Sequence, residues 1–447
     1  MFSLSSSLFI IIFLFSCLLF YRNFSKIIRN ISLGRDAGVF KNKRARWKNV
    51  LFIAFGQKKM FKKPLVALLH LVVYLGFIII NIEIVEIILD GILGTHRILF
   101  SPKWSGLYNF CINSFEILAL LVLVACVVFL VRRNIIKIKR FFSPEMKGWP
   151  TSDANLILIF EILLMSAFLF MNAADLSLQK IAYQEVYLQN KYPNTGDFLI
   201  SGIISSLLND ISITNLILIE RFCWWFHILG IFGFLNYLVI SKHLHIILAF
   251  PNTYYGSLKP QGQFNNMQSV TNEVKLMLDP NTDPFAQSEN SSPPDRFGAK
   301  DVTDLNWLQL LNAYSCTECG RCTSECPANV TGKKLSPRKI MMDVRDRVEE
   351  VGKGLDLNGK DFNDGKSLLH DFIKPEELWA CTSCNACVEA CPLSIDPLSI
   401  IMELRRYSVM EESSAPTELN TVFSNIENNG APWQFSSSDR LNWKDDE

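Results

Sequence analysis

Eight cysteines in a repeated spacing are the residues of this 447-residue chain best suited to carry chemistry. They form two copies of the pattern Cys-x-x-Cys-x-x-Cys-x-x-x-Cys-Pro, one over residues 316–327 and one over residues 381–392. In this pattern, three thiolates of each copy bind one [4Fe–4S] cluster and the fourth thiolate binds the other cluster. The reason is geometric. Three closely spaced thiolates wrap one corner of a cubane, while the fourth lies on a following helix that has turned toward the second cubane.

We therefore predict two clusters with crossed ligands. One set is Cys316, Cys319, Cys322 and Cys391, and the other is Cys381, Cys384, Cys387 and Cys326. A single Cys-x-x-Cys would also suit a zinc knuckle or a redox dithiol. Two identical runs, each closed by a proline, fit neither a zinc site nor a disulfide framework. Because such clusters carry electrons, the pattern predicts an electron-transfer protein.

The apolar residues and the cluster cysteines lie in different halves of the chain. Hydrophobic residues make up 49% of the sequence, and nearly all strongly apolar runs lie before residue 250. The cluster cysteines follow residue 315, and their reduced thiolates favour the cytoplasm for this half. The formal net charge of +1 gives no indication of nucleic-acid binding. The other cysteines sit in or beside apolar runs and are expected to be buried small hydrophobes: Cys17, Cys111, Cys126 and Cys223.

Five apolar runs are long enough to cross a bilayer. They are Leu4–Tyr21, Leu65–Leu89, Leu107–Val131, Leu156–Ala173 and Ile217–Ile240. The first run lacks a basic n-region and an A-x-A-like cleavage site, so we expect an uncleaved helix rather than a signal peptide.

The distribution of lysine and arginine predicts the orientation of these spans. Basic residues crowd the segments from Lys41 to Lys63 and from Arg132 to Arg140, whereas the loops after the second and fourth runs are sparsely basic. Loops rich in lysine and arginine stay in the cytoplasm. We therefore predict a multi-pass protein of the bacterial inner membrane, with its N-terminus outside and everything after Lys242 in the cytoplasm.

Five of the six histidines lie in or beside the apolar runs, where neutral imidazole can bind haem iron. His70 and His245 both lie at the cytoplasmic end of a run, so this pair is expected to hold a haem b. A helix turns about 100° per residue, so His227 and His245, eighteen residues apart, share one face roughly 27 Å apart at about 1.5 Å per residue, which suits two stacked haems. His96 is the remaining outer partner for His227. His243 points toward the opposite face and is expected to be a polar residue at the membrane interface.

Two carboxylates lie deep in the second run, at Glu83 and Glu86. Ionisable groups at such depth are costly and usually face a bundle interior or a cavity. We consider two roles for them, a proton-transfer or quinone site and a helix–helix hydrogen bond.

These patterns divide the chain into four parts. We expect a transmembrane domain over residues 1–250, a linker over 251–300, a cluster domain over 301–410 and a polar tail over 411–447. The predicted fold is all-α. It consists of a five-helix transmembrane haem-binding bundle followed by a cytoplasmic helical domain with two [4Fe–4S] clusters.

The cluster domain resembles a known family. Its segments 316–327 and 378–392 look like those of the alpha-helical ferredoxins that serve as the dicluster component of heterodisulfide reductase, and the succinate dehydrogenase iron–sulfur protein has a similar domain. The long stretch between the two runs suits helices such as one around Pro337–Glu349, as in the helical family.

Residues 1–250 resemble the gamma subunit of respiratory nitrate reductase and the cytochrome b component of heterodisulfide reductase. On that resemblance, His70 and His245 bind the inner haem and His227 binds the outer one. The second run carries Ile80 where the family has another histidine.

The resemblance implies a membrane-bound oxidoreductase subunit that moves electrons between a cytoplasmic iron–sulfur or flavoprotein partner and menaquinone. Related oxidoreductases continue into a CCG domain. This chain has no Cys-Cys pair, so we expect that part on a separate polypeptide, with electron-transfer flavoprotein as a further partner. Two other classes remain open: a nonenzymatic redox sensor or assembly anchor, and a transporter with an electron-driven step. Haem content distinguishes the sensor, which has no need of a transmembrane electron path.

Overall fold

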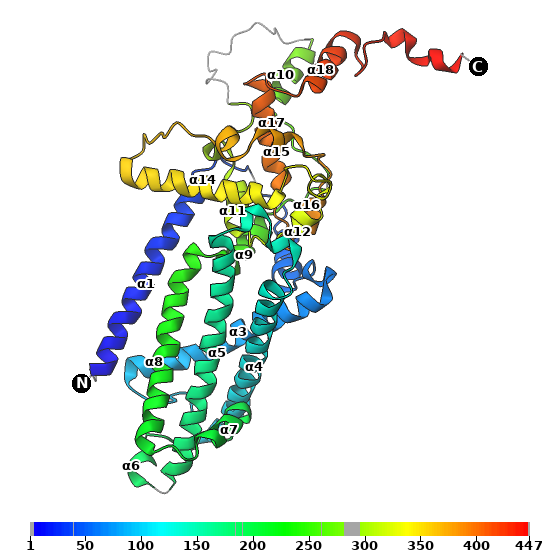
Figure 1. Ribbon diagram of the computed structural model, residues 1–447. Coiled ribbons are helices and arrows are strands. Elements are labelled where there is room, and N and C mark those ends of the chain that lie inside the picture. The colour runs from blue at the N-terminus through cyan, green and yellow to red at the C-terminus, as the bar shows by residue number, and fades with distance from the viewer. Residues whose placement is uncertain are drawn as a thin grey trace. The chain divides into compact units, whose positions relative to one another are not determined.

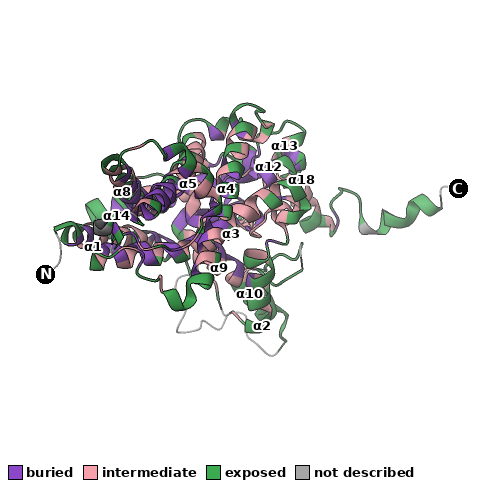
Figure 2. Ribbon diagram, turned by 90° about the horizontal axis from the view of Figure 1, so that it is seen from below, coloured by how far each residue is buried: buried purple, intermediate pink, exposed green. Residues whose placement is uncertain are grey.

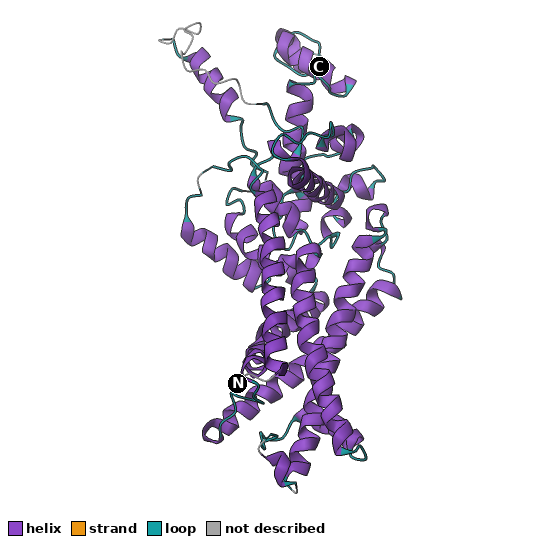
Figure 3. Cartoon of the chain, turned by 90° about the vertical axis from the view of Figure 1, so that its left-hand side faces the viewer, coloured by secondary structure: helices purple, strands orange, loops and turns teal. Residues whose placement is uncertain are grey.

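The computed structural model describes residues 4–38, 40–183, 185–189, 191–260, 262–280 and 296–445. Within these residues the chain is helical, and its only β-type contacts are isolated bridges between Arg35 and Asn306 and between Leu369 and Ile373. Figure 3 shows helices and loops throughout. The prediction of an all-α chain is therefore confirmed for the described residues. Residues 281–295 of the expected linker lie outside them.

The described chain divides into two compact units. The first unit comprises residues 1–29, 44–254 and 314–320, and the second comprises residues 30–43, 255–313 and 321–447. The division passes through the first cysteine motif between Gly320 and Arg321, so Cys316 and Cys319 belong to the first unit.

Five helices of the first unit are long and apolar enough to cross a membrane, as predicted. They are α1 (Leu4–Ile31), α3 (Pro64–Leu93), α4 (Ser105–Asn134, preceded by η3, Pro102–Trp104), α5 (Trp149–Ala182) and α8 (Ile213–Tyr237, continued by η7, Leu238–Ile240). Each extends beyond the apolar run that predicted it, because polar residues at the ends continue the helical hydrogen bonding.

The centre of this bundle is α5, which packs against α4 on one side and α8 on another, while α3 packs against α4 (Figure 1). The core contains Phe9, Ile112, Phe168 and Ile228, each at most 1% exposed. Buried positions gather on α5 and α8 (Figure 2). Many of the exposed side chains of the five long helices are apolar. Exposed apolar side chains of this kind suit a hydrocarbon environment.

The helix does not continue from His227 to His245. After η7 the chain is extended at Ser241 (φ −110°, ψ 152°), forms the short η8 (Lys242–Leu244) and starts again as α9 (His245–Tyr255). The Asp153 carboxylate of α5 accepts hydrogen bonds from the Ser241 hydroxyl at 2.7 Å and the Lys242 amide at 3.1 Å, which holds the break. The prediction that His227 and His245 share one face of one helix is therefore wrong.

The remaining elements of the first unit are short. They are α2 (Lys43–Asn49), η1 (Val50–Phe55), η2 (Met60–Lys62), η4 (Lys139–Phe141), η5 (Pro144–Met146), α6 (Val186–Gln189), α7 (Leu199–Ser205) and η6 (Ser206–Leu208).

The second unit is built from shorter helices around α14 (Pro337–Asn358), which packs against α17 (Pro397–Met410). Its other helices are α10 (Gln268–Leu278), η9 (Val302–Asp304), most of α11 (Trp307–Ser315), α12 (Arg321–Ser324), α13 (Pro327–Val330), η10 (Leu368–Phe372), α15 (Pro375–Trp379), α16 (Ala386–Ala390), α18 (Thr417–Asn429) and η11 (Ser437–Lys444).

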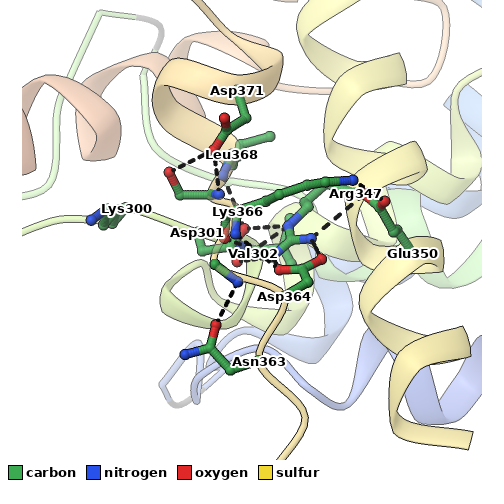
Figure 4. Close-up of polar contacts among 12 residues, drawn as sticks. Lys300, Asp301, Val302, Arg347, Glu350, Asn363, Asp364, Lys366, Leu368 and Asp371 are labelled. Atoms are coloured by element: carbon green, nitrogen blue, oxygen red, sulfur yellow. Dashed lines mark hydrogen bonds and ion pairs between the residues drawn. The ribbon is translucent and has the colours of Figure 1, made fainter. Parts of the chain in front are cut away.

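Arg347 of α14 fixes the loops on either side of the helix. Its guanidinium donates to Asp301 at 2.7 Å and to Asp364 at 2.6 Å, and Figure 4 shows both carboxylates turned toward it. Its side chain is only 3% exposed, so these charge-assisted bonds form largely away from water. The long helix between the cysteine motifs thus serves as the frame of this unit.

Candidate redox sites

The two cysteine motifs begin with the same local structure. The Glu318 amide donates to the Cys316 sulfur at 3.4 Å, and the Ser383 amide donates to the Cys381 sulfur at 3.4 Å. Both donors have left-handed backbone, with φ of 54° at Glu318 and 57° at Ser383. Left-handed backbone is unfavourable for such residues. Its occurrence at matching positions shows that both loops are built to curl around the sulfur.

The two motifs also have the same backbone conformation after their second cysteines. The residue after each second cysteine is again left-handed, Gly320 with φ 71° and Asn385 with φ 60°. A short helix follows, α12 in the first motif and α16 in the second. The fourth cysteines are then extended, with ψ of 118° at Cys326 and 124° at Cys391. Each fourth thiol is thereby separated from the first three by one turn of helix.

The second unit brings Cys326 close to the second motif. Burial raises the pKa of the Cys387 thiol to about 12, and nearby Asp396, Cys381 and Cys326 raise it as well. Burial also raises the pKa of Cys381, and Cys326 and Cys384 act in the same direction. These four thiols are the set predicted for one cluster.

The donor set can also be tested against the alternatives. None of the twelve cysteines, all of which are described, forms a disulfide. Among the described residues, no three histidine, cysteine or acidic side chains lie close enough to bind a single metal ion.

A positive charge lies beside the second motif. Arg405 of α17 donates to the Cys381 carbonyl at 2.6 Å and to the Leu378 carbonyl at 2.8 Å, and its guanidinium lies 4.8 Å from the Trp379 ring centre. The sequence offered no signal for this contact, because Arg405 comes from a separate helix and its position depends on tertiary packing.

Three histidines gather in the first unit where the bundle meets α9. The rings of His243 and His245 are 5.5 Å apart, and burial together with nearby His245 and His70 lowers the pKa of His243 to about 3. The break at Ser241 turns His243 toward the other two, and its interpretation as a polar residue at the membrane interface stays a prediction.

The partners of His70 and His245 suit metal ligation. Nδ1 of His70 lies 3.1 Å from Oε1 of the buried Gln57, and Nδ1 of His245 lies 3.1 Å from the Lys242 carbonyl. A histidine that binds a metal usually donates its other ring nitrogen to a carbonyl or carboxylate, which fixes the tautomer. Both Nδ1 contacts are of this kind. Gln57 was missed in the sequence, where a lone glutamine in a basic loop carries no signal.

The two outer histidines have different surroundings. His227 is 1% exposed, and its Nδ1 lies 3.0 Å from the Leu164 carbonyl, a contact of the same kind. His96 instead places Nε2 3.0 Å from the Asp175 carboxylate and packs its ring 5.1 Å from that of Tyr192. The partnership of His227 with His96 stays a prediction, and the geometry gives His96 a structural role.

The loop after α3 folds back onto the helix through Asp90. Gly94 ends α3 in the left-handed region, with φ 72°. The Asp90 carboxylate then accepts from the Thr95 hydroxyl at 2.6 Å, the Arg97 amide at 2.7 Å and the Ile98 amide at 3.1 Å. This loop carries Arg97 into the bundle.

Arg97 is 7% exposed, and its guanidinium joins the loop after α3 to two helices, α4 and α5. It donates to Asp175 at 2.6 Å, to Asn172 at 2.8 Å and to the Tyr108 hydroxyl at 3.2 Å. Asn172 in turn donates to Glu116 at 3.2 Å. A buried charge is tolerated when it is paired and hydrogen-bonded, and this network meets both conditions.

Glu83 and Glu86 border this network, but their surroundings differ. Glu86 accepts from the Leu99 amide at 2.9 Å and the Tyr108 hydroxyl at 2.8 Å, so both its oxygens are used. Glu83 is 4% exposed, and its Oε2 has no hydrogen-bond partner among the described residues. It lines a cavity of about 20 Å³, space for one water molecule and too small for a quinone ring. The cavity is also lined by Glu86, His96, Arg97, Asp175 and Glu220.

A larger hollow of the bundle lies elsewhere. A groove of about 300 Å³, between α4, α5 and α7, is lined almost entirely by apolar side chains, among them Leu123, Phe170 and Ile204. It shares no lining residue with the cavity at Glu83. Room for an apolar ligand and groups able to exchange protons are therefore separate features of this bundle.

Comparison with known proteins agrees with the cysteine geometry. A family model described as a 4Fe-4S dicluster domain matches residues 315–395. Over 98% of its length the chain is 28% identical to a probable iron-sulfur-binding oxidoreductase, FadF, of Bacillus subtilis. It is also 28% identical, over 88% of its length, to the EtfAB:quinone oxidoreductase of Syntrophomonas wolfei.

The chain spans 60% and 53% of the lengths of these two relatives. A shorter match covers 26% of the chain and 60% of one subunit of a CoB-CoM heterodisulfide reductase of Methanosarcina acetivorans, at 34% identity. No solved structure is similar. The chain thus contains a 4Fe–4S dicluster domain, combines it with five apolar helices, and is similar to iron–sulfur oxidoreductases.

Proposed function

We propose that this chain is a membrane-bound oxidoreductase subunit that carries electrons between a soluble redox partner and the quinone pool in respiratory electron transport. The observation that carries the proposal is the packing of α12 of the first motif against α16 of the second, which brings Cys326 to the thiols of the second motif and matches crossed ligation of two clusters. Cys316, Cys319, Cys322 and Cys391 hold one [4Fe–4S] cluster, and Cys381, Cys384, Cys387 and Cys326 hold the other. Each bound cluster accepts and releases one electron at a time.

The first unit holds haem b between His70 and His245. Support comes from the two Nδ1 contacts, which are of the kind that orients a metal-binding histidine. His227 meets the same condition and is the candidate for a second haem. When bound, haem iron exchanges one electron at a time with the clusters.

Glu83 is proposed to exchange protons with a quinone, while Glu86 positions Tyr108 and the loop after α3. Oxidation of a quinol releases two electrons and two protons. Because the cavity at Glu83 is too small for the quinone ring, the unused carboxylate oxygen of Glu83 exchanges protons with the quinone through the water for which the cavity has space. The name of the relative in Syntrophomonas wolfei supports a quinone as one electron partner.

The soluble partner is proposed to be an electron-transfer flavoprotein, with a CCG-domain iron–sulfur protein as a further partner. The first suggestion rests on the name of the same relative, and the second on the similarity to one component of a heterodisulfide reductase. We place the dicluster domain in the cytoplasm and the N-terminus outside, because the basic loops are expected on the cytoplasmic side of the bacterial inner membrane.

The test uses the full chain, purified anaerobically in detergent with clusters and haem quantified. A menaquinol analogue should reduce the haem, and Glu83→Gln should slow this step roughly a hundredfold with haem content unchanged. Glu116→Gln is the matched control, because that carboxylate is equally buried but both its oxygens are hydrogen-bonded. If no quinol reduces the haem of fully loaded protein, the quinone role is wrong and the sensor hypothesis is favoured.

A further inference from the structure

Lys242 is a buried lysine at the end of the last span. Its side chain is 10% exposed, and its ammonium donates to the Pro150 carbonyl at 2.7 Å and lies 3.8 Å from the Asp153 carboxylate. It also makes a short ion pair with Glu318. The next residue along the chain is His243, and His245 follows two positions later.

Glu318 connects this lysine to a cysteine. It lies between Cys316 and Cys319, and its side chain is 3% exposed. Its amide donates to the Cys316 sulfur while its carboxylate pairs with Lys242. A single residue therefore bonds to a predicted cluster ligand through its main chain and to the histidine-bearing segment through its side chain.

The lysine itself is held in place by α5. Asp153 accepts from the Ser241 hydroxyl and from the Lys242 amide, so the same carboxylate fixes the backbone and faces the ammonium. All of these residues belong to the first compact unit, which includes residues 314–320. The first cysteine loop is thereby part of the structure that carries the histidines.

A buried ion pair is a weak source of stability, because desolvating both charges offsets most of their attraction. What such a pair contributes well is a fixed geometry and a fixed local charge. Both matter for an iron–sulfur cluster, whose reduction potential depends on net charge and hydrogen bonds around its sulfurs.

We propose that Lys242 and Glu318 are positioning residues that fix the first cysteine loop at the haem end of the last span. The cluster held by Cys316 and Cys319 then exchanges electrons with the haem, and the cluster of the second motif faces the soluble partner. In this exchange one electron leaves the reduced cluster and converts ferric haem iron to ferrous, or passes in reverse. The electron order rests on the proposed function, whereas the positioning of the loop does not.

The experiment is a redox titration of the two cluster signals, followed by electron paramagnetic resonance, in the full chain with clusters and haem bound. Glu318→Gln removes a negative charge and should raise the midpoint potential of the first cluster. Lys242→Met removes a positive charge and should lower it. Lys242→Arg keeps the charge and should restore the original value. The first cluster is recognised as the signal that survives in Cys326→Ser.

A kinetic measurement tests the order of transfer. Electron exchange between the first cluster and the haem should slow about tenfold in Glu318→Gln, because the loop loses its fixed position. Lys339→Met is the matched control, since Lys339 also pairs with two acidic residues, Asp343 and Glu377, but within the second unit. It should leave the first cluster signal and its exchange with haem unchanged.

The proposal is overturned if both variants shift the second cluster signal or shift neither. If Lys242→Met does not fold, Glu318→Gln still decides, because it is isosteric and removes only the charge. Wild-type protein that lacks haem would refute the proposed function, yet the opposite shifts of the first cluster would still support the positioning role. If the variants shift the midpoint potential of the first cluster as expected but its electron exchange with the haem keeps its rate, only the proposed order of electron transfer is wrong.

Discussion

The loop from Cys316 to Cys322 and the loop from Cys381 to Cys387 have the same backbone turns, yet they present different side chains at the matching positions. Glu318 in the first loop pairs with Lys242, whereas its counterpart Ser383 cannot form an ion pair. The positive charge near the second loop is Arg405, which donates to the Cys381 carbonyl at 2.6 Å and to the Ser383 hydroxyl at 3.5 Å, and to no carboxylate of the described residues of this loop. The shared backbone suits one kind of cofactor, and the different surroundings suit two roles in one electron path.

Replacing the fourth cysteine of either motif should have the largest effect on the two clusters. Cys326→Ser should lose or convert the cluster of Cys381, Cys384 and Cys387 and keep the other, although Cys326 belongs to the first motif. Cys391→Ser should do the reverse. Iron and sulfide analysis, about eight of each per wild-type chain for two [4Fe–4S] clusters, together with the cluster signals measures both effects. Loss of the cluster belonging to its own motif in either variant would reject crossed ligation.

Haem loss is the next largest effect. His70→Ala and His245→Ala should each abolish the low-spin b-type band of the inner haem and leave both clusters in place, because the first cysteine loop is held by Glu318 and not by the histidines. Pyridine haemochrome analysis gives the haem content and separates one haem from two. His370→Ala, in the second unit and paired with Glu412, is the control. Full haem content in both variants would contradict the assignment.

The sequence predicted the parts of this comparison that depend on local spacing. The cysteine motifs and the five apolar helices follow from residues whose type and interval carry the signal, and so does the choice of His70 and His245 as candidates. The break at Ser241 could not be predicted, because it depends on Asp153 from α5, far away in the chain. Gln57, Lys242, Arg97 and Arg405 were missed for the same reason, since their partners come from other elements.

Arg405 provides a third, smaller test. Arg405→Met should lower the midpoint potential of the second cluster. The change should correspond to about 1 kcal/mol, because a nearby positive charge favours the more negative, reduced state of the cluster. The first cluster should not respond. Arg405→Lys keeps the charge but loses the forked contact to the Leu378 and Cys381 carbonyls, and it should recover only part of the shift. A redox titration measures the three values. An equal shift of both clusters would mean that the two surroundings are not separate.

The smallest effect concerns the left-handed residues after the second cysteines. Gly320 and Asn385 have nearly the same φ, but a side chain with a Cβ is disfavoured there by about 1 kcal/mol unless it is asparagine or aspartate. Gly320→Ala should therefore lower the melting temperature of the cluster-loaded chain by a few degrees or less. Asn385→Gly should change it hardly at all, while Asn385→Ala should resemble Gly320→Ala. Because the same left-handed turn occurs in both loops, equal losses of melting temperature in Gly320→Ala and Asn385→Ala would support a shared backbone design. A loss confined to one loop would show that the other can rearrange around its cluster.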